Sequence, residues 1–344
     1  MGKKIEFIRQ KSESYILDPR KNFEKTGCPI EIRIDPLTGK TGRLCHFGGI
    51  TPQKLNFDLY TNPETRGFCP FCPETRDKFT PKFPPEILPE GRMTKGEAYL
   101  FSNLYPYDLF SSVVVMTDAH LVKVNEFTEK QILDTLSLGI EFLKIIQKKH
   151  PEIPYYLMGW NYMPPSGSSI VHPHQQFLAS KTPGNQYMDE LRASEAYYKE
   201  NNSNFWVDLI EEEKKLGERY IAELGSGFWL SSFVSSGTLG EIIAILPEVY
   251  TLEDLNEKHL EDLTKGIMKV LAFYGDHQMY SFNGSLFLGP KGQNYFSAHF
   301  RMVARTYLNS LNYPADFFFV QVLFKDPVCA IYPEELAQKL KPYF

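Results

Sequence analysis

The stretch SGSSIVHPHQQ, residues 166–176, joins a Gly/Ser loop to a segment that has the composition of a strand. In an extended segment alternate side chains share a face, so His172, His174 and Gln176 would point the same way. The loop before them offers backbone N–H groups and hydroxyls, which bind phosphate oxygens, and an imidazole can attack phosphorus as a nucleophile. We therefore predict a phosphate-handling site here. The alternative is a solvated strand edge with two histidines that have no role.

A second motif, Cys69-Pro70-Phe71-Cys72, lies about a hundred residues upstream. A CxxC pair can place two thiolates on one metal ion, can serve as a redox couple, or can be two free thiols. A redox pair is expected where a βαβ unit starts a helix at the motif, whereas here Pro73 follows and the flanking sequence is irregular, which favours a metal. Zinc takes about four ligands. The candidates for the remaining ligands are His46, His120, His172 and His174.

Around these motifs the chain is expected to alternate between strands and helices. Residues 62–96 are rich in Pro, Gly and charge and are expected to form a loop-rich insertion. The apolar periodicity that follows Thr128 predicts a helix over 128–147, with Thr128 as its N-cap. A charged helical region is expected over 187–223, interrupted at 201–204. Strands are predicted at 98–103, 111–116, 155–162 and 172–179.

One strand–loop–helix unit occurs twice along the chain. Residues 113–116 and 127–132 are echoed by residues 242–246 and 255–260, at an offset of about 128. The first copy carries His120, His172 and His174, whereas the second has only His299 at a corresponding place. This pattern predicts an active half followed by a degenerate, structural half; the alternative is two unrelated α+β units.

Composition limits the function classes. The 344 residues suggest about two domains. Lys plus Arg is 37 and Asp plus Glu is 42, a balance of −5, which disfavours nucleic-acid binding through the overall field. The N-terminus lacks the apolar segment of a signal peptide, and no apolar run approaches the length of a membrane span. With five cysteines, these features predict a cytoplasmic protein without disulfides that does not bind membranes.

These motifs resemble those of the galactose-1-phosphate uridylyltransferases and their relatives in the histidine-triad (HIT) superfamily. The family motif HPHxQ is matched by residues 172–176, and the family's CPxC pair by residues 69–72. The resemblance implies an α+β fold of tandem HIT-like repeats, with mainly antiparallel sheets and flanking helices. It also implies a catalytic half with a zinc-binding insertion over 1–185 and a degenerate half over 186–344.

The resemblance further implies roles for individual residues. It makes His174 the nucleophile and Gln176 a hydrogen-bond donor to the phosphate. It implies one structural Zn2+ held by Cys69, Cys72, His120 and His172. It implies nucleotide or phosphate contacts by Arg33, Asn103, Asn161, Gly167, Ser168 and Ser169.

The activity that the resemblance implies is a double displacement. His174 would attack the α-phosphorus of a nucleotide sugar, sugar 1-phosphate would leave, and a phosphorylated acceptor would then take the nucleotide from the imidazole. Histidine-triad hydrolases have a third histidine where Gln176 stands, and glutamine is a poor proton shuttle, which favours transfer over hydrolysis. The partners are small phosphorylated molecules, and the family suggests a homodimer.

The sequence departs from the galactose-specific members in the second half. Ser297 and Asn283 stand where such members have histidine ligands of a second metal, so that site is expected to be absent. Residues 318–322 and 327–328, where the family reads sugar hydroxyls, are apolar apart from Gln321. In the first half, Leu104 follows Asn103 where the family often has an acid.

Three functions stay open at this point. The first is a nucleotidyltransferase of the uridylyltransferase type. The second is a phosphorylase of nucleotide sugars or dinucleoside polyphosphates, with inorganic phosphate as acceptor, to which the apolar C-terminal region gives weight. The third is a non-catalytic, zinc-stabilised nucleotide-binding protein.

Overall fold

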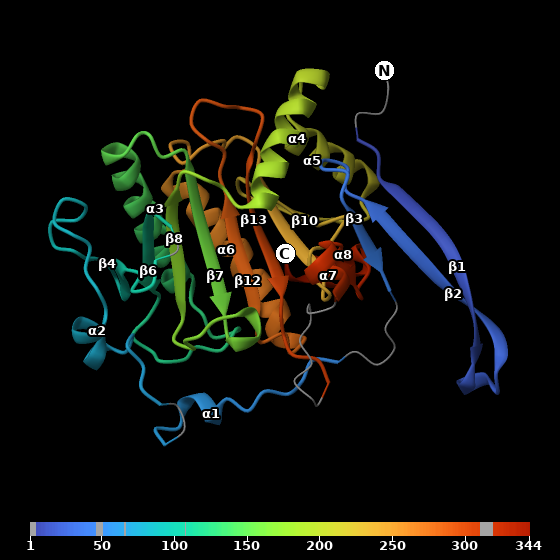
Figure 1. Ribbon diagram of the computed structural model, residues 1–344, viewed down its shortest axis with the longest axis horizontal. Coiled ribbons are helices and arrows are strands. Elements are labelled where there is room, and N and C mark those ends of the chain that lie inside the picture. The colour runs from blue at the N-terminus through green and yellow to red at the C-terminus, as the bar shows by residue number, and fades with distance from the viewer. Residues whose placement is uncertain (1–4, 46–50, 65–66, 107, 310–318) are drawn as a thin grey trace.

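The computed structural model describes residues 5–45, 51–64, 67–106, 108–309 and 319–344 (Figure 1). The helices are α1 (Asp58–Thr61), α2 (Pro73–Phe79), α3 (Glu129–Lys149), α4 (Asn185–Asn201), α5 (Phe205–Leu216), α6 (Glu257–Asp276), α7 (Phe319–Phe324) and α8 (Pro333–Leu340). The strands are β1 (Ile8–Asp18), β2 (Glu24–Ile34), β3 (Thr41–Leu44), β4 (Met93–Lys95), β5 (Ala98–Ser102), β6 (Phe110–Val115), β7 (Tyr155–Tyr162), β8 (His174–Ser180), β9 (Tyr220–Leu224), β10 (Gly227–Ser231), β11 (Glu241–Leu246), β12 (Phe282–Phe287), β13 (Ala298–Ala304) and β14 (Val328–Cys329).

The described strands form two sheets. The smaller has the order β1-β2-β3-β14, and its β1–β2 hairpin projects away from the body of the molecule (Figure 1). The larger has ten strands in the order β4-β5-β6-β8-β7-β12-β13-β11-β10-β9. All pairs are antiparallel except β14 with β3. The predicted α+β class with mainly antiparallel sheets is therefore confirmed.

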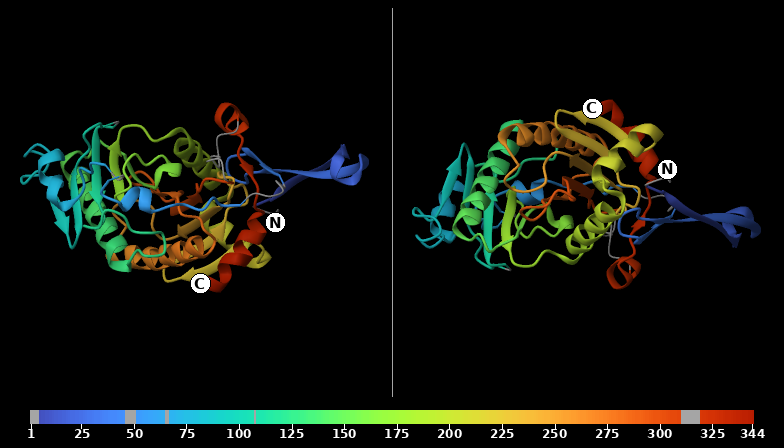
Figure 2. Two further views of the ribbon diagram at one scale, coloured as in Figure 1. Left: turned by 90° about the horizontal axis from the view of Figure 1, so that it is seen from below. Right: turned by 90° about the horizontal axis from the view of Figure 1, so that it is seen from above.

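The large sheet consists of two copies of one strand order. Read inward from one edge it runs β4-β5-β6-β8-β7, and read inward from the other it runs β9-β10-β11-β13-β12. The two copies meet where β7 pairs with β12. The long helices α3 and α6 lie side by side and cover one face of both copies (Figure 2). This arrangement confirms the tandem repeats; the boundary between residues 185 and 186 stays a prediction.

Local chemistry is repeated along with the topology. Both long helices begin with a capping box, Thr128 with Gln131 in α3 and Asn256 with His259 in α6. Two residues after the N-cap, Lys130 pairs with Asp134 and, in the second copy, Lys258 pairs with Asp262, at 2.5 and 2.6 Å.

A glycine faces each of these aspartates. Gly96 and Gly225 each have φ of +58°, and a Cβ on either would come within 2.2 Å of the facing aspartate side chain. Only glycine adopts this backbone without strain and leaves that space. The close contact between hairpin turn and helix is thus the same in both copies.

The charged region after residue 185 is helical only in part. Helices α4 and α5 break at 202–204, as expected, but residues 220–224 form β9 instead of continuing the helix. Gly217 ends α5 with φ of +68°, and β9 then pairs with β10. The helical prediction to residue 223 is therefore wrong, because strand pairing outweighs the helical propensity of these residues.

Among the described residues, no helix combines the length and the apolar composition that a membrane span requires.

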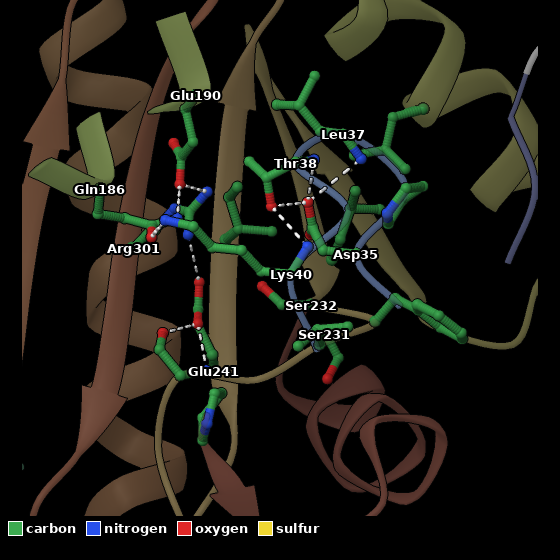
Figure 3. Close-up of a pocket in the computed structure, with 18 of the residues that line it drawn as sticks. Asp35, Leu37, Thr38, Lys40, Gln186, Glu190, Ser231, Ser232, Glu241 and Arg301 are labelled. Carbon is green, nitrogen blue, oxygen red and sulfur yellow. Dashed lines mark hydrogen bonds and ion pairs between the residues drawn. The ribbon is translucent and has the colours of Figure 1, made fainter. Parts of the chain in front are cut away.

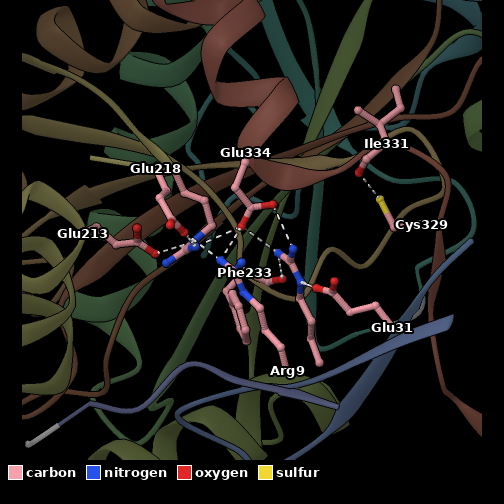
Figure 4. A network of polar contacts seen from close by, with 10 residues as sticks. Arg9, Glu31, Glu213, Glu218, Phe233, Cys329, Ile331 and Glu334 are labelled. Carbon is pink, nitrogen blue, oxygen red and sulfur yellow. Dashed lines mark hydrogen bonds and ion pairs between the residues drawn. The ribbon is translucent and has the colours of Figure 1, made fainter. Parts of the chain in front are cut away.

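A cluster of buried ion pairs ties the small sheet to the second half (Figure 4). Glu334 at the start of α8 receives hydrogen bonds from three guanidinium groups, those of Arg9, Arg33 and Arg219, at 2.8–3.0 Å. These bonds lower the pKa of Glu334 to about 2, although burial opposes the shift. Glu213, which accepts from Arg219 at 2.8 Å, has its pKa raised to about 7, because burial outweighs that bond.

We predict that two glutamate-to-glutamine changes in this cluster have different effects. Glu334→Gln should lower the free energy of unfolding by about 2–4 kcal/mol, because three guanidinium groups lose their shared carboxylate. Glu213→Gln should cost far less. Because folding raises the pKa of Glu213, the folded protein keeps this carboxyl protonated up to about pH 7. The stability that Glu213 contributes is therefore complete below its ordinary pKa and is lost as the pH rises through about 7. Since glutamine does not titrate, the free energy of unfolding of Glu213→Gln should rise relative to that of the wild type as the pH rises.

Urea unfolding of both variants and the wild type, below and above about pH 7, measures these differences. Equal losses in the two variants at every pH would contradict the assignment of the proton to Glu213.

Candidate active site and metal centre

Four side chains that are far apart in sequence meet at one edge of the first half. Ligand atoms of Cys69, Cys72, His120 and His172 all lie within 4.8 Å of one another. Cys72 Sγ is 3.3 Å from His120 Nδ1 and 3.7 Å from His172 Nδ1, and Cys69 Sγ is 3.7 Å from the same His172 atom. A tetrahedral ion with ordinary Zn–N and Zn–S bond lengths separates its ligand atoms by roughly 3.3–3.8 Å. The group therefore fits a metal ion of that kind.

The first two residues of this group are placed by a short helix. Cys72 is the N-cap of α2, and Pro73 occupies the helix's first turn. The hydroxyl of Thr75 contacts the carbonyl oxygens of both Cys69 and Cys72, at 2.7 and 2.9 Å. A helix therefore does begin at the motif, where the sequence predicted an irregular segment. The element before it among the described residues is the short helix α1 and not a strand, so the pair does not lie in the βαβ setting of a redox motif.

His172 is held so that one ring nitrogen faces the thiols. Its Nε2–H donates to the carbonyl oxygen of Thr117 at 2.8 Å, because a carbonyl can only accept. The proton is therefore on Nε2, and the Nδ1 lone pair points toward the two sulfur atoms. A backbone carbonyl behind a histidine is the usual way to fix a metal-binding tautomer. Burial lowers the pKa of His172 to about 4, which also keeps the ring neutral.

His174 is the first residue of β8 and lies beside the metal group. Its Nδ1–H donates to the carbonyl oxygen of His172 at 2.8 Å, which leaves the lone pair on Nε2. The ring of Phe71, from the CxxC turn, packs edge-on against His174 at a centroid distance of 5.1 Å. Burial lowers the pKa of His174, against the opposing effect of the Nδ1 hydrogen bond. The result is a neutral, oriented imidazole of the kind that nucleophilic catalysis requires.

The predicted Gly/Ser loop leads into β8, whose first residue is His174. Gly167 has φ of +89°, a left-handed conformation that glycine adopts without strain, and Gly167 and Ser169 are both exposed. Ser168 is buried, and its hydroxyl donates to the carbonyl oxygen of Ile170 at 2.7 Å, so it supports the loop from behind. Gln176 is on the same strand face as His174.

Asn161, on the neighbouring strand, is exposed, and it lies two residues beyond Gly159, which pairs with Gln176. That register places the amide at the level of His174.

The other predicted contacts lie elsewhere. Arg33 is 1% exposed and is held by Glu31 and Glu334 in the ion-pair cluster, so a phosphate contact by this side chain is not supported. The resemblance that implies this contact rests on local sequence, which carries no information on Glu334, a carboxylate from a distant part of the chain. Asn103 follows β5, and its side chain accepts from the backbone N–H of Tyr105, which places it at the other end of the strands from His174. His46 lies outside the described residues.

Two residues near the loop have contacts that the sequence does not predict. Asn283 on β12 donates to the side-chain oxygen of Asn161 at 2.7 Å and to the carbonyl oxygen of Ser166 at 3.0 Å. Arg305 in turn donates to Asn283 Oδ1 at 2.9 Å, which brings a cation toward the loop from the second half. These residues are neighbours because β7 pairs with β12, and no local sequence pattern predicts that pairing.

The second half has a histidine at the matching ladder position. His174 lies opposite Val115 and His299 lies opposite Ile245, and each Nδ1–H donates to the carbonyl oxygen two residues earlier. His299, however, is completely buried, stacked on Trp206 and 3.5 Å from Glu190. It is therefore closed to any substrate, as a degenerate half would be.

We predict that the purified protein carries about one divalent metal ion per chain. Cys72→Ser should remove it and loosen the segment around α2, because this segment buries few apolar side chains of its own. Elemental analysis and limited proteolysis measure both effects. Cys28→Ser, in β2, is the matched control and should retain the metal. Metal-free wild-type protein, purified without chelator, would refute this prediction.

Comparisons with known proteins agree with this geometry. No protein-family model matches the chain. An uncharacterized protein from Archaeoglobus fulgidus is 35% identical over 315 residues, which cover 91% of this chain and 92% of that one. Among solved structures, a galt-like protein from Arabidopsis thaliana has a TM-score of 0.67 at 17% identity, covering 90% of this chain and 98% of that chain.

Two further structures are similar to this chain over 91% of its length and 98% of theirs. An ADP-glucose phosphorylase from Arabidopsis thaliana with bound ADP-glucose has a TM-score of 0.67 at 16% identity. A uridylyltransferase has a TM-score of 0.65 at 20% identity. The chain therefore belongs to one family with the Archaeoglobus protein, and it shares the fold of the galt-like protein, the ADP-glucose phosphorylase and the uridylyltransferase.

Proposed function

We propose that this protein is a nucleotidyltransferase that moves a nucleoside monophosphate from a nucleotide sugar to a phosphate-bearing acceptor through a covalent nucleotidyl-histidine. The observation that carries the proposal is the orientation of His174. Its Nδ1–H is committed to the carbonyl oxygen of His172, so Nε2 holds the free lone pair. A nucleotide-binding protein without catalysis would have no need of such a nucleophile.

The reaction balances in two displacements. His174 Nε2 forms a bond to the α-phosphorus as the bond to the sugar 1-phosphate oxygen breaks, and the sugar 1-phosphate leaves. An oxygen of the acceptor phosphate then forms the new bond to phosphorus, and the imidazole leaves with its electron pair. The Nδ1–H bond to a carbonyl stabilises the positive charge that the imidazole carries in the intermediate.

Donors around the loop supply the electrostatic stabilisation. Charge grows on the non-bridging oxygens during each displacement, and preorganised donors there lower the barrier. We assign this role to Gln176, to Asn161 and to the exposed loop at Gly167 and Ser169, with Ser168 supporting the loop from beneath. We assign Arg305, which donates to Asn283 beside this loop, as the cation that contacts the phosphates.

The metal has a structural role in this proposal. The four-residue group fits Zn2+, whose preference for two thiolates and two imidazoles in tetrahedral geometry matches the side chains present. Bound there, the ion would fix His172 and, through the backbone, His174. The side chains of Cys69, Cys72, His120 and His172 would hold it, and none of them is the nucleophile.

A homodimer belongs to the same proposal. Helix α7 exposes three large apolar side chains, Phe319, Leu323 and Phe324, with exposed fractions of 67–73%. Side chains of this kind favour contact with another protein surface.

The acceptor divides the proposal into two forms. A sugar 1-phosphate acceptor makes the enzyme a uridylyltransferase-like transferase, whereas inorganic phosphate makes it a nucleotide-sugar phosphorylase. The second form has its own support, because the ADP-glucose phosphorylase is as similar in fold as the uridylyltransferase and because the C-terminal region is apolar where sugar hydroxyls would need partners.

We predict that the protein gains the mass of one nucleoside monophosphate after incubation with UDP-glucose or ADP-glucose. His174→Gly should abolish this adduct, and turnover should fall by several orders of magnitude. Intact-protein and peptide mass spectrometry measure the adduct. His259→Gln keeps a side chain that fits the capping box of α6 and should label normally. Full turnover by His174→Gly would refute the covalent mechanism.

We further predict that the isolated adduct is discharged by a phosphate-bearing acceptor much faster than by water, because Gln176 cannot shuttle a proton as histidine does. Phosphate and glucose 1-phosphate, added separately, distinguish the phosphorylase from the transferase by the nucleotide product. Gln176→His should increase hydrolysis of the adduct. Discharge that is equally fast in buffer alone would instead identify a hydrolase.

A further inference from the structure

A cavity that is separate from the His174 site lies on the other half of the large sheet (Figure 3). Its volume is about 300 Å³, and it lies between the turn at residues 35–40, helices α4 and α5, and strands β10, β11 and β13. In Figure 3, Arg301, Glu190 and Glu241 lie on one side and the turn with Asp35 and Thr38 lies on the other. The proposed nucleotidyl transfer uses none of these residues.

The polar wall is rigid. Arg301 is held between two buried carboxylates, with Nη2 3.0 Å from Glu190 and Nη1 3.1 Å from Glu241. Glu190 also accepts from Gln186 at 2.7 Å, and Glu241 accepts from the backbone N–H of Ser236 at 2.8 Å. The side chains are thus fixed before any ligand arrives, which lowers the entropic cost of binding.

Buried polar atoms of residues that line this cavity lack the hydrogen bonds that such atoms normally have. Within the described part of the chain, neither Nε of Arg301 nor Oε2 of Glu213 has a hydrogen-bond partner. Leaving a buried donor or acceptor unsatisfied is unfavourable, and a ligand that bonds to these atoms would remove that penalty. Ser232, directly after β10, also lines the cavity and offers a hydroxyl there.

The opposite wall is apolar and partly aromatic. Phe205 and Trp206 from α5 and Leu230 from β10 all line the cavity and are all buried. A flat apolar wall beside fixed hydrogen-bonding groups suits a ligand with one apolar face and a polar rim.

The charges around the cavity exclude strongly charged ligands. The carboxyl groups of Asp35, Glu190, Glu213 and Glu241 line it together with the cations of Arg301, Lys40 and Lys325. A phosphate would have to lie beside carboxylates, and an ammonium ion beside a guanidinium group. A neutral ligand with several hydroxyls meets neither repulsion, since hydroxyls can both donate to the carboxylates and accept from Arg301.

We propose that this cavity is a binding site for a neutral polyhydroxylated molecule about the size of one sugar ring. The proposal does not depend on nucleotidyl transfer. Arg301 is on β13 and His174 is on β8, three strand spacings or roughly 14 Å apart across the sheet. A ligand in the cavity therefore does not reach the nucleophile.

Titration with D-glucose, D-galactose or D-mannose, followed by calorimetry and by tryptophan fluorescence, tests the proposal. Trp206 lines the cavity, whereas Trp160 and Trp229 lie in the core on the other face, so Trp206→Phe should remove the fluorescence change. We expect saturable binding of one sugar per chain at millimolar concentration or below, both in the wild type and in His174→Gly. Ser232→Ala should weaken it about three- to tenfold, and Ser232→Phe, which fills the cavity, should abolish it.

Three outcomes would overturn the proposal. In the first, none of the three sugars binds at millimolar concentration. In the second, binding is lost in His174→Gly but unchanged in Ser232→Ala and Ser232→Phe, which would locate the sugar at the other site. In the third, glucose 1-phosphate or arginine binds in the cavity and the neutral sugars do not, which would make the ligand class wrong. Circular dichroism of each variant confirms that a loss of binding is not a loss of folding.

Discussion

The hydrogen bond from His172 Nε2–H to the carbonyl oxygen of Thr117 is the constraint on which the first half depends. It turns the Nδ1 lone pair toward the thiols of Cys69 and Cys72. The carbonyl group of His172 then accepts the Nδ1–H of His174. One residue thus links the irregular insertion, which has little apolar burial of its own, to the orientation of the candidate nucleophile. Without that hydrogen bond the His172 ring would not be fixed with Nδ1 toward the thiols.

Duplication explains how the same backbone serves two purposes. Each half places a histidine at the same ladder position and with the same bond to the carbonyl group two residues earlier. In the first half the histidine borders an exposed loop. In the second half Trp206 and Glu190, from the helices that cross that face, seal His299 completely. The covering helices also create the cavity beside Arg301, because they do not pack fully against the turn at residues 35–40.

The sequence alone predicted the parts of the fold that local signals specify. The apolar periodicity after Thr128 predicts helix α3 and its N-cap, and strand β7 has the predicted bounds, residues 155–162. Two strong signals, HPHxQ and CPxC, carry the resemblance to a known family, and that resemblance implied both the fold and the four-residue metal group. Ligand chemistry alone left four histidines as candidates. The sequence prediction failed at residues 220–224, where pairing with β10 decides the structure and local propensity does not.

The sequence by itself therefore determined which reactive groups are present: the thiols, the imidazoles and the glutamine in place of a third histidine. It also determined the repeat. The tertiary structure decided how these groups are used. It buried Arg33 among carboxylates from distant segments, brought Arg305 and Asn283 to the loop across the β7–β12 pairing, and enclosed a cavity around Arg301. The physical reason is that hydrogen-bond partners, burial and charge balance depend on contacts between residues far apart in the chain, and a local pattern carries no record of them.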